Sequence, residues 1–335
     1  MTRILKRLCA VLAAACLLTA LLGGCGDSGS ADKQTVNILS ANYEEQIALQ
    51  LDYLREKFPD AEINITYMSS GKLAAKLQAE GADTDVDIAL SLSSGYANIL
   101  KEAGLLRAFE SPSAYKTEYA DADNMVLPNG VWCGAILVNT EELQRLGLPE
   151  PDSFADLTDP VYKGQIVMAN PNSSSTGYFF LLGILNLYGE EAGWAYFDAL
   201  KNNIMLFGES GSTPSSMVEK GEAPIALGID YEGMRLAADG KPVKVIFPEE
   251  GAPYDYDTAL LINRSEEPSA FVLEVMQAIT SEEGNAVFNN YNIAVLENGA
   301  DRGDYPDDFK LMDMSGIADT ELKARLSAEW SARYE

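Results

Sequence analysis

The sequence contains no histidine, and it has only four cysteines among its 335 residues. Without histidine the chain lacks the commonest general base, the commonest metal ligand and the usual pH switch of proteins. Basic residues are also scarce, because 24 Lys and Arg stand against 51 Asp and Glu, which gives a formal net charge of −27. Such a charge argues against a nucleic-acid partner and against adhesion to anionic lipid surfaces.

Motifs of the common enzyme classes are missing from the sequence as well. There is no CxxC pair, no HExxH, no Walker loop and no GxGxxG after a strand. Cys133 has apolar neighbours and no histidine to activate it, so we expect an inert, buried thiol. Trp132 is typical of a core or a cleft wall. We therefore expect a protein that is not an enzyme and has no cofactor and no dedicated metal site, with an enzyme on the same scaffold as the alternative.

The N-terminus has the pattern of a secretory signal. Three basic residues within the first seven positions precede an apolar stretch at 8–22, which is short for a membrane-spanning helix of ~20 residues, and "LGGC" follows. Small residues after an apolar run mark a cleavage site. A cysteine at this point resembles the lipobox of bacterial lipoproteins, and this resemblance implies lipid attachment to Cys25. We expect a signal peptide at 1–24, a flexible tether at 25–34, and anchoring at the extracytoplasmic face of the cell membrane.

The segments that follow alternate between strand and helix patterns. Strands are expected at 35–40, 61–68 and 86–92, and helices at 42–58, 69–81 and 93–104. This β-α-β-α-β order is the build of a doubly wound parallel sheet.

Two later apolar strands divide the chain into two α/β domains. The run at 131–140 is interpreted as a strand that leaves the first domain, and the one at 254–263 as a strand that crosses back. The length also suits two domains. We expect lobe 1 to comprise residues 35–130 and 260–335, and lobe 2 to comprise residues 131–259, with the two crossing strands as the hinge.

Hydroxyl and amide side chains gather at the points where strands give way to helices. The segment "NPNSSSTGYFFLLG" is the clearest, because one N-cap hydroxyl would satisfy an orphan amide. Similar groups recur along the chain: Asn42, Ser69 and Ser70, Ser93 and Ser94, Ser173 to Thr176, and Ser210 to Thr213. Helix N-termini bind anions through free amides and the helix dipole, and in open α/β sheets the ligand crevice lies beyond the carboxyl ends of the strands. The pattern predicts an oxyanion site, with simple helix capping as the alternative at some of these clusters.

Three segments carry a resemblance to a known family. The stretches 170–204, 211–233 and 243–262 resemble type 2 solute-binding proteins of ABC importers, in the branch that binds ferric iron, phosphonates such as 2-aminoethylphosphonate, and phosphorylated sugars. The resemblance covers most of residues 35–300. It implies two lobes that close on a small solute and deliver it to ABC permease subunits. We expect a monomeric binding component.

The junctions and the resemblance together give a set of expected ligand-binding residues. These are Asn42, Tyr43, Ser93, Ser94, Ser174, Ser175, Thr176, Gly177, Ser212, Thr213, Asp230 and Tyr231. Gly177 would let the backbone approach a ligand closely, and Asp230 would hold an ammonium group.

Two alternative functions stay open beside capture of a phosphonate or phosphorylated compound. The iron-binding members carry adjacent tyrosines here, whereas this chain has Tyr231 alone, so a ferric site would also have to recruit Tyr43, Tyr178 or Tyr291. The other alternative is a ligand sensor that feeds a signalling partner.

Overall fold

The computed structural model describes residues 34–335 apart from 43, 290 and 304. The expected signal peptide, the lipid site Cys25, nearly all of the tether and Tyr43 therefore lie outside the described residues. No helix within the described part of the chain is long and apolar enough to cross a membrane.

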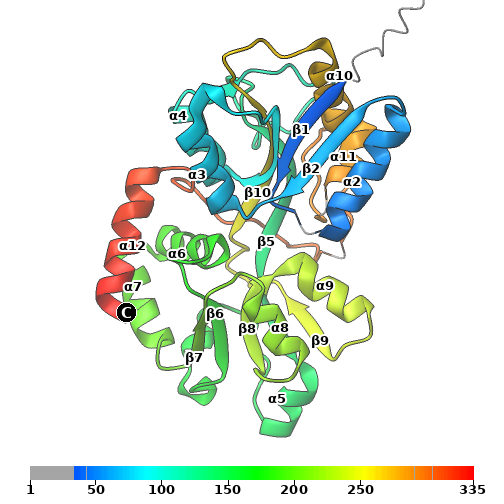
Figure 1. Ribbon diagram of the computed structural model, residues 1–335. Coiled ribbons are helices and arrows are strands. Elements are labelled where there is room, and N and C mark those ends of the chain that lie inside the picture. Colours follow the sequence, from blue (N-terminus) through cyan, green and yellow to red (C-terminus); the bar gives the residue numbers. More distant parts are fainter. Residues whose placement is uncertain (1–33, 43, 290, 304) are drawn as a thin grey trace, which may run out of the picture.

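One mixed sheet runs through the molecule, in the strand order β2-β1-β3-β10-β5-β8-β6-β7, with β4 paired to β10 and β9 paired to β5 (Figure 1). The strands are β1 Thr35–Ser40, β2 Glu62–Tyr67, β3 Ile88–Ser93, β4 Leu106–Arg107, β5 Leu127–Asn139, β6 Ile166–Ala169, β7 Ile204–Gly208, β8 Ile225–Ile229, β9 Val243–Ile246 and β10 Tyr254–Ile262. Strands β2, β1 and β3 pair in parallel, as do β7, β6 and β8. The expected pair of doubly wound lobes is confirmed.

Helices follow most strands and cover the sheet. They are α2 Glu44–Lys57, α3 Ser70–Glu80, α4 Ser94–Glu102, α5 Thr140–Leu146, α6 Ser175–Tyr188, α7 Glu190–Leu200, α8 Thr213–Glu219, α9 Asp230–Ala238, α10 Ala270–Thr280, α11 Glu282–Phe288 and α12 Thr320–Tyr334. Helix α6 is buried continuously from its second to its eleventh residue. A helix that is apolar on every side belongs inside a domain, and α6 contacts strands β5, β6, β8 and β10 as well as helix α7.

Strands β5 and β10 carry the sheet from one lobe to the other. Residues 127–133 of β5 pair with β10, and residues 134–138 pair with β8 in lobe 2. The pairing of β10 shifts register next to Asp257 and Thr258 on both of its sides. Such bulges bend a strand and turn its side chains, so the crossing strands are irregular at the point between the lobes.

The C-terminal segment corrects one expected boundary. We expected all of residues 260–335 in lobe 1. Helices α10 and α11 do pack in the lobe 1 core, but Met312, Met314, Leu326 and Trp330 join the core of lobe 2. Trp330 packs edge-on against Phe197 of α7, with 5.5 Å between ring centroids, and α12 runs along α7 in Figure 1. The burial of these apolar side chains holds the chain end on lobe 2.

Candidate functional site

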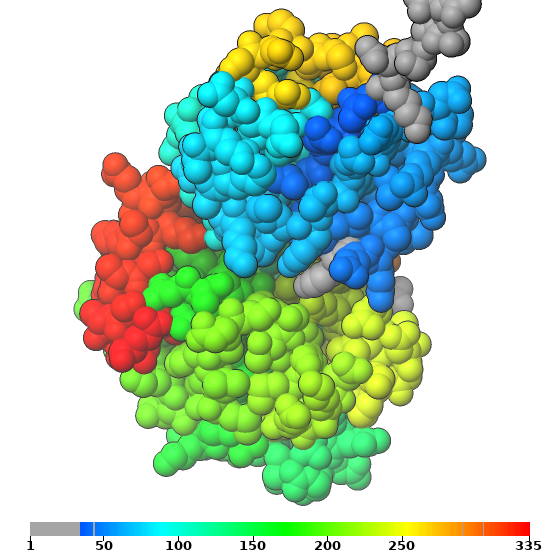
Figure 2. All heavy atoms as spheres, viewed as in Figure 1, coloured from blue at the N-terminus to red at the C-terminus, as the bar shows by residue number. Residues whose placement is uncertain are grey.

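A cavity of about 570 Å³ lies between the lobes, and we call it the cleft cavity. Lobe 1 contributes the starts of α2 and α3 and the end of β3, and lobe 2 contributes the starts of α6, α8 and α9. The crossing strands contribute Trp132 and Asp257. The space-filling view shows the surface hollowed between the two lobes (Figure 2). A site at the carboxyl ends of the strands is where open α/β sheets bind ligands.

Half of the expected ligand residues line the cleft cavity. They are Asn42, Ser174, Ser175, Thr176, Ser212 and Tyr231, and the junction residues Ser69 and Ser70 line it as well. The structure therefore brings together hydroxyl groups from both lobes, from helices more than 100 positions apart in the sequence.

The serines at these helix starts do not cap their helices. The N-cap residues of α3, α6 and α8 make no side-chain cap hydrogen bond, and they are Ser69, Ser174 and Ser212. Away from the cavity, the N-cap side chains of α5, α10, α11 and α12 accept from backbone amides, and they are Asn139, Ser269, Ser281 and Asp319. Ser93 at the N-cap of α4 makes no such bond. Capping alone thus does not account for the serines of the cleft, and the first amides of α3 and α6 keep their capacity to bind an anion.

Two buried polar atoms at the cavity lack a hydrogen-bond partner among the described residues. They are Nδ2 of Asn42 and Oγ of Ser91, on side chains that are 4% and 5% exposed. Ser91 also has a left-handed backbone, with φ of 61°, which is strained for a residue other than glycine. An unsatisfied buried polar group costs about 1–3 kcal/mol, so a solute that bonded these atoms would recover that free energy.

A buried carboxylate and several aromatic rings line the same cavity. Asp257 accepts hydrogen bonds from Nε1 of Trp132, at 3.2 Å, and from the hydroxyl of Tyr291. Burial raises the pKa of Asp257 to about 7. The ring of Tyr231 packs against that of Tyr291, with centroids 4.9 Å apart. Trp132, Tyr231 and Tyr291 all border the cavity.

Ser93 and Ser94 were expected to contact the ligand, but the structure does not place them at the cavity. Both are buried, and Ser94 donates from its hydroxyl, at 2.5 Å, and from its amide, at 3.3 Å, to Asp255 of β10. The N-terminus of α4 therefore already holds an anion, which is a side chain of the protein. Burial raises the pKa of Asp255 to about 6.

Gly177 and Thr213 also differ from expectation, because both pack within lobe 2. A Cβ at Gly177 would lie 2.5 Å from the carbonyl oxygen of Ala169, so this glycine allows α6 to approach the end of β6. The side chain of Thr213 lies against Gly208 in the same way. At both positions a helix start packs closely against the end of a strand, and the close contact is within the protein and not with a ligand.

Asp230 is engaged inside the protein and does not line the cavity. Its carboxylate accepts from the amide of Cys133, at 3.1 Å, and from the hydroxyl of Tyr305, at 2.8 Å. Burial raises its pKa and also raises that of the Cys133 thiol. Cys133 is fully buried, as expected for an unreactive thiol. Asp230 was the carboxylate expected at the ligand, whereas the aspartate that lines the cavity is Asp257.

Several residues of the cavity were not predicted from the sequence, namely Tyr67, Lys72, Ser91, Tyr96, Glu209 and Asp257. The available signal was the alternation within β10, where Asp255 and Asp257 occupy buried positions of an otherwise apolar strand. Aspartate is almost never fully buried unless it is paired.

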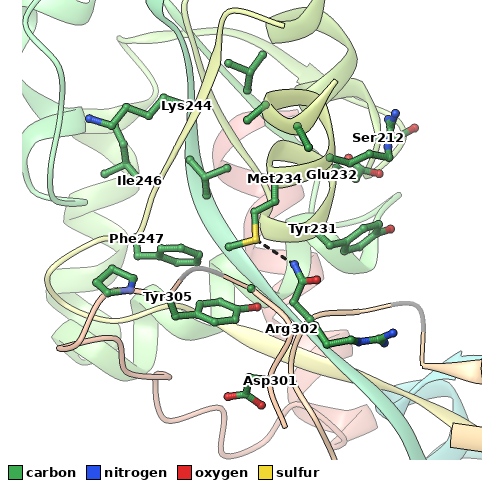
Figure 3. A pocket seen from close by; sticks show the side chains of 18 of the residues that line it. Ser212, Tyr231, Glu232, Met234, Lys244, Ile246, Phe247, Asp301, Arg302 and Tyr305 are labelled. Atoms are coloured by element: carbon green, nitrogen blue, oxygen red, sulfur yellow. Dashed lines mark hydrogen bonds between the residues drawn. The ribbon is translucent and has the colours of Figure 1, made fainter. Parts of the chain in front are cut away.

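A wider cavity of about 1790 Å³ adjoins the cleft cavity, and Ser212 and Tyr231 border both. Figure 3 shows this side cavity between Met234 of α9, the aromatic rings of Phe247 and Tyr305, and Arg302. The amide of Asn292 donates to Sδ of Met234 at 3.0 Å. The smaller cavity is lined by helix starts of both lobes at the carboxyl ends of the strands, so it is the better candidate site for a small solute.

Within the described part of the chain, no group of three or more His, Cys, Asp or Glu side chains is placed to hold a metal ion. Tyr231 and Tyr291 reach the cleft cavity. Tyr178, a further expected iron candidate, packs instead with its ring 5.0 Å from Nζ of Lys323.

Comparison with known proteins assigns the chain to a family. The profile of the bacterial extracellular solute-binding proteins matches residues 83–313. The chain belongs to this family, and its fold is that of the type 2 periplasmic binding proteins of ABC importers, which confirms the resemblance.

The chain is similar in sequence to curated proteins and in fold to solved structures. The chain is 29% identical over 214 residues to an uncharacterized protein of Haemophilus influenzae, covering 60% of each, and 27% identical over 178 residues to a thiamine-binding periplasmic protein of Brucella abortus, covering 51% of each. The matches thus span about half to 60% of these relatives. AfuA from Actinobacillus pleuropneumoniae, with fructose-6-phosphate bound, matches with a TM-score of 0.78 at 23% identity, over 90% of this chain and 98% of that one. Iron-bound HitA from Pseudomonas aeruginosa matches with a TM-score of 0.71 at 19% identity, over 89% and 99%.

Proposed function

We propose that this extracellular solute-binding protein is the lipid-anchored receptor of an ABC importer and captures a small phosphonate or phosphorylated compound in the cleft cavity. The observation that carries the proposal is the pair of open helix starts at that cavity. The N-terminus of α3 in lobe 1 and that of α6 in lobe 2 border the same space, and neither N-cap serine is used for capping.

An oxyanion between these helices would bond to both lobes. It would accept from backbone amides, whose dipoles favour negative charge, and from serine hydroxyls, which donate or accept as required. Lys72, in the first turn of α3, adds a positive charge at the same cavity. Because such a solute has contacts to both lobes only when they are close, it favours the closed state by its differential affinity.

The remaining parts of the proposal rest on the sequence. The basic segment, the apolar stretch and "LGGC" support cleavage before Cys25 and lipid attachment there. The protein would then act as a monomer tethered at the extracytoplasmic face, and the closed form would dock on the permease subunits of the importer.

Ferric ion is the second candidate cargo, because one observation favours it. The rings of Tyr231 and Tyr291 lie 4.9 Å apart at the cleft cavity, and the hydroxyl of Tyr291 donates to Asp257. Phenolate and carboxylate oxygens are hard ligands of the kind that suit hard cations. A sensor that passes ligand-driven closure to a signalling partner would use the same site.

The variant Ser174→Asp, which introduces a negative charge, tests the anion site. Aspartate is a good N-cap, so helix α6 should keep its stability, while a fixed negative charge occupies the place of the oxyanion. Ser269→Asp, at the N-cap of α10, is the matched control in the lobe 1 body.

Thermal unfolding with methylphosphonate, 2-aminoethylphosphonate, fructose 6-phosphate and ferric citrate gives the readout, because a ligand of the native state raises the Tm. We expect a phosphonate or phosphate ester to raise the Tm of the parent protein and of Ser269→Asp, with at least a tenfold loss of affinity in Ser174→Asp. A shift with ferric citrate alone, unchanged in Ser174→Asp, would instead identify an iron-binding protein.

A further inference from the structure

Asp257 is a buried carboxylate at the cleft cavity without a cationic partner. It is 7% exposed, and its hydrogen-bond donors, Trp132 and Tyr291, are both neutral. No lysine or arginine in the described part of the chain forms an ion pair with it. Burying a charge is costly unless it is paired. An ionised carboxylate has about four acceptor positions, so this group has room for a further donor.

The walls around this carboxylate are aromatic. Trp132, Tyr231 and Tyr291 border the cavity together with Asp257. Trp132 is held in place by the ring of Phe179, with centroids 5.0 Å apart, and by its hydrogen bond to Asp257. The face of an aromatic ring attracts a cation within about 6 Å of its centroid. A carboxylate beside aromatic rings therefore has the chemistry of an ammonium site.

The cavity thus borders two groups of opposite preference. The starts of α3 and α6 favour an anion, whereas Asp257 repels one in its ionised form. Both groups line one space of about 570 Å³, which is within the size range of small-molecule sites. A solute with a single negative group would leave Asp257 unpaired, while a solute with charges of both signs would satisfy both ends.

From this arrangement we infer that the solute is a zwitterion. Asp257 binds its cationic nitrogen among the aromatic side chains of Trp132, Tyr231 and Tyr291, and its phosphonate or phosphate lies at the starts of α3 and α6. This inference rests on the proposed function and narrows it to aminoalkyl phosphonates and phosphate esters of amino alcohols. It also assigns to Asp257 the ammonium-binding role that the sequence had suggested for Asp230.

Protonation of Asp257 is consistent with this role. Burial raises its pKa to about 7, and the negative charge of Asp255 adds to the rise. In the empty site the carboxyl group therefore takes up a proton near neutral pH. A bound ammonium group favours the ionised form and lowers the pKa, so binding would be accompanied by proton release.

Matched pairs of probes test the inference directly. Isothermal titration calorimetry would compare 2-aminoethylphosphonate with ethylphosphonate, and phosphorylethanolamine with ethyl phosphate, on the parent protein and on Asp257→Asn. We expect the amine-bearing member of at least one pair to bind at least tenfold more tightly. In Asp257→Asn this preference should fall below about threefold, because the neutral amide neither attracts the ammonium group nor repels the anion as a carboxylate does.

Asp255→Asn is the matched control, since Asp255 is a buried carboxylate on the same strand that bonds to Ser94 instead of bordering the cavity. It should keep the preference for the amine. Tyr291→Phe, which removes one donor to Asp257 and keeps the ring, gives a second and milder variant should Asp257→Asn unfold.

The outcomes separate the inference from the proposed function. Equal binding of both members of each pair, or a preference that survives in Asp257→Asn and Tyr291→Phe alike, would overturn the zwitterion and leave the anion site standing. Binding of no phosphonate or phosphate ester, with or without an amine, would overturn both.

Discussion

At the scale of single residues, the cleft cavity is a place where the protein leaves polar groups unsatisfied. Asn42 and Ser91 keep buried atoms without partners among the described residues, and Asp257 is buried without a cation. Each arrangement costs free energy in the empty protein. Such costs persist at functional sites because a ligand offsets them, which is the residue-level basis of the binding proposal.

The buried carboxylates predict an unusual pH dependence of stability. Burial raises the pKa of Asp257 to about 7 and that of Asp255 to about 6, against about 4 in an unfolded chain. The folded protein then binds more protons than the unfolded chain between about pH 4 and 7. The contribution of Asp255 and Asp257 to the free energy of unfolding is therefore full below pH 4 and is lost as the pH rises to about 7.

Urea unfolding of ligand-free protein and of Asp257→Asn, from pH 4.5 to 8, measures this contribution. Each unit of pKa shift corresponds to about 1.4 kcal/mol, so the stability of the parent protein relative to the variant should fall by more than 1 kcal/mol over that range. Parallel curves for the two proteins would show that Asp257 titrates normally.

At the scale of secondary-structure elements, the position of α6 is set by a glycine. Gly177 lies in the first turn, and a Cβ there would come within 2.5–2.6 Å of backbone atoms of residues 169–171. The helix can therefore start at the end of β6, where its first amides border the cleft. The glycine serves the binding site through this packing, and not through direct contact with a solute.

Gly177→Ala should destabilise the protein and weaken ligand binding together. Overpacking against backbone costs about 1–3 kcal/mol, and a displaced α6 moves its amides away from the solute. Gly95→Ala is the control, because its Cβ would meet its nearest atom at 3.4 Å and alanine favours a helix. Chemical denaturation and calorimetry of both variants check the expectation, which fails if Gly177→Ala unfolds and binds like the parent.

Helix α12 fastens the end of the chain to lobe 2 and also reaches lobe 1. Trp330 fills the space between Phe197 and Phe207. Nζ of Lys323 lies 5.1 Å from the ring centroid of Tyr96 in lobe 1 and 5.0 Å from that of Tyr178 in lobe 2. The helix thus has contacts on both sides of the cleft.

Removing the anchor of α12 should be costly. Trp330→Ala should lower the free energy of unfolding by about 3–5 kcal/mol, as for other large aromatic residues in a core. Leu49→Ala, at a position that is 63% exposed, should change it by less than about 0.5 kcal/mol. Equal unfolding midpoints for the two variants would mean that α12 is not part of the lobe 2 core.

The sequence predicted the elements around the cleft better than it predicted the cavity lining. Clusters such as Ser173 to Thr176 are visible because hydroxyls before an apolar helix form a local pattern. Asp257 was not assigned, because its partners Trp132 and Tyr291 lie 125 and 34 positions away. The lobe of α12 was likewise hidden, since it depends on contacts with α7, far along the chain.

At the scale of the whole molecule, the negative net charge opposes the approach of an anionic solute to the cleft. The chain has a net charge of −27, which repels an anionic solute at long range, whereas the helix starts attract it at contact. Salt screens distant charges more than it weakens contacts in a partly buried site. The Debye length falls from about 30 Å at 0.01 M to about 8 Å at 0.15 M ionic strength.

The association rate of an anionic solute should therefore rise with salt over this range. Stopped-flow measurement of tryptophan fluorescence with fructose 6-phosphate would follow it, because Trp132 borders the cavity. A rate that falls with salt would mean that a local positive field dominates the approach to the cleft.

The central claim is that an anionic group lies between the starts of α3 and α6. A crystal structure of the protein grown with 2-aminoethylphosphonate tests it most directly. We predict phosphonate oxygens within hydrogen-bond distance of the first amides of both helices, with the amine beside Asp257. A ligand bound outside the cleft cavity, or one whose phosphonate contacts neither helix start, would contradict the account.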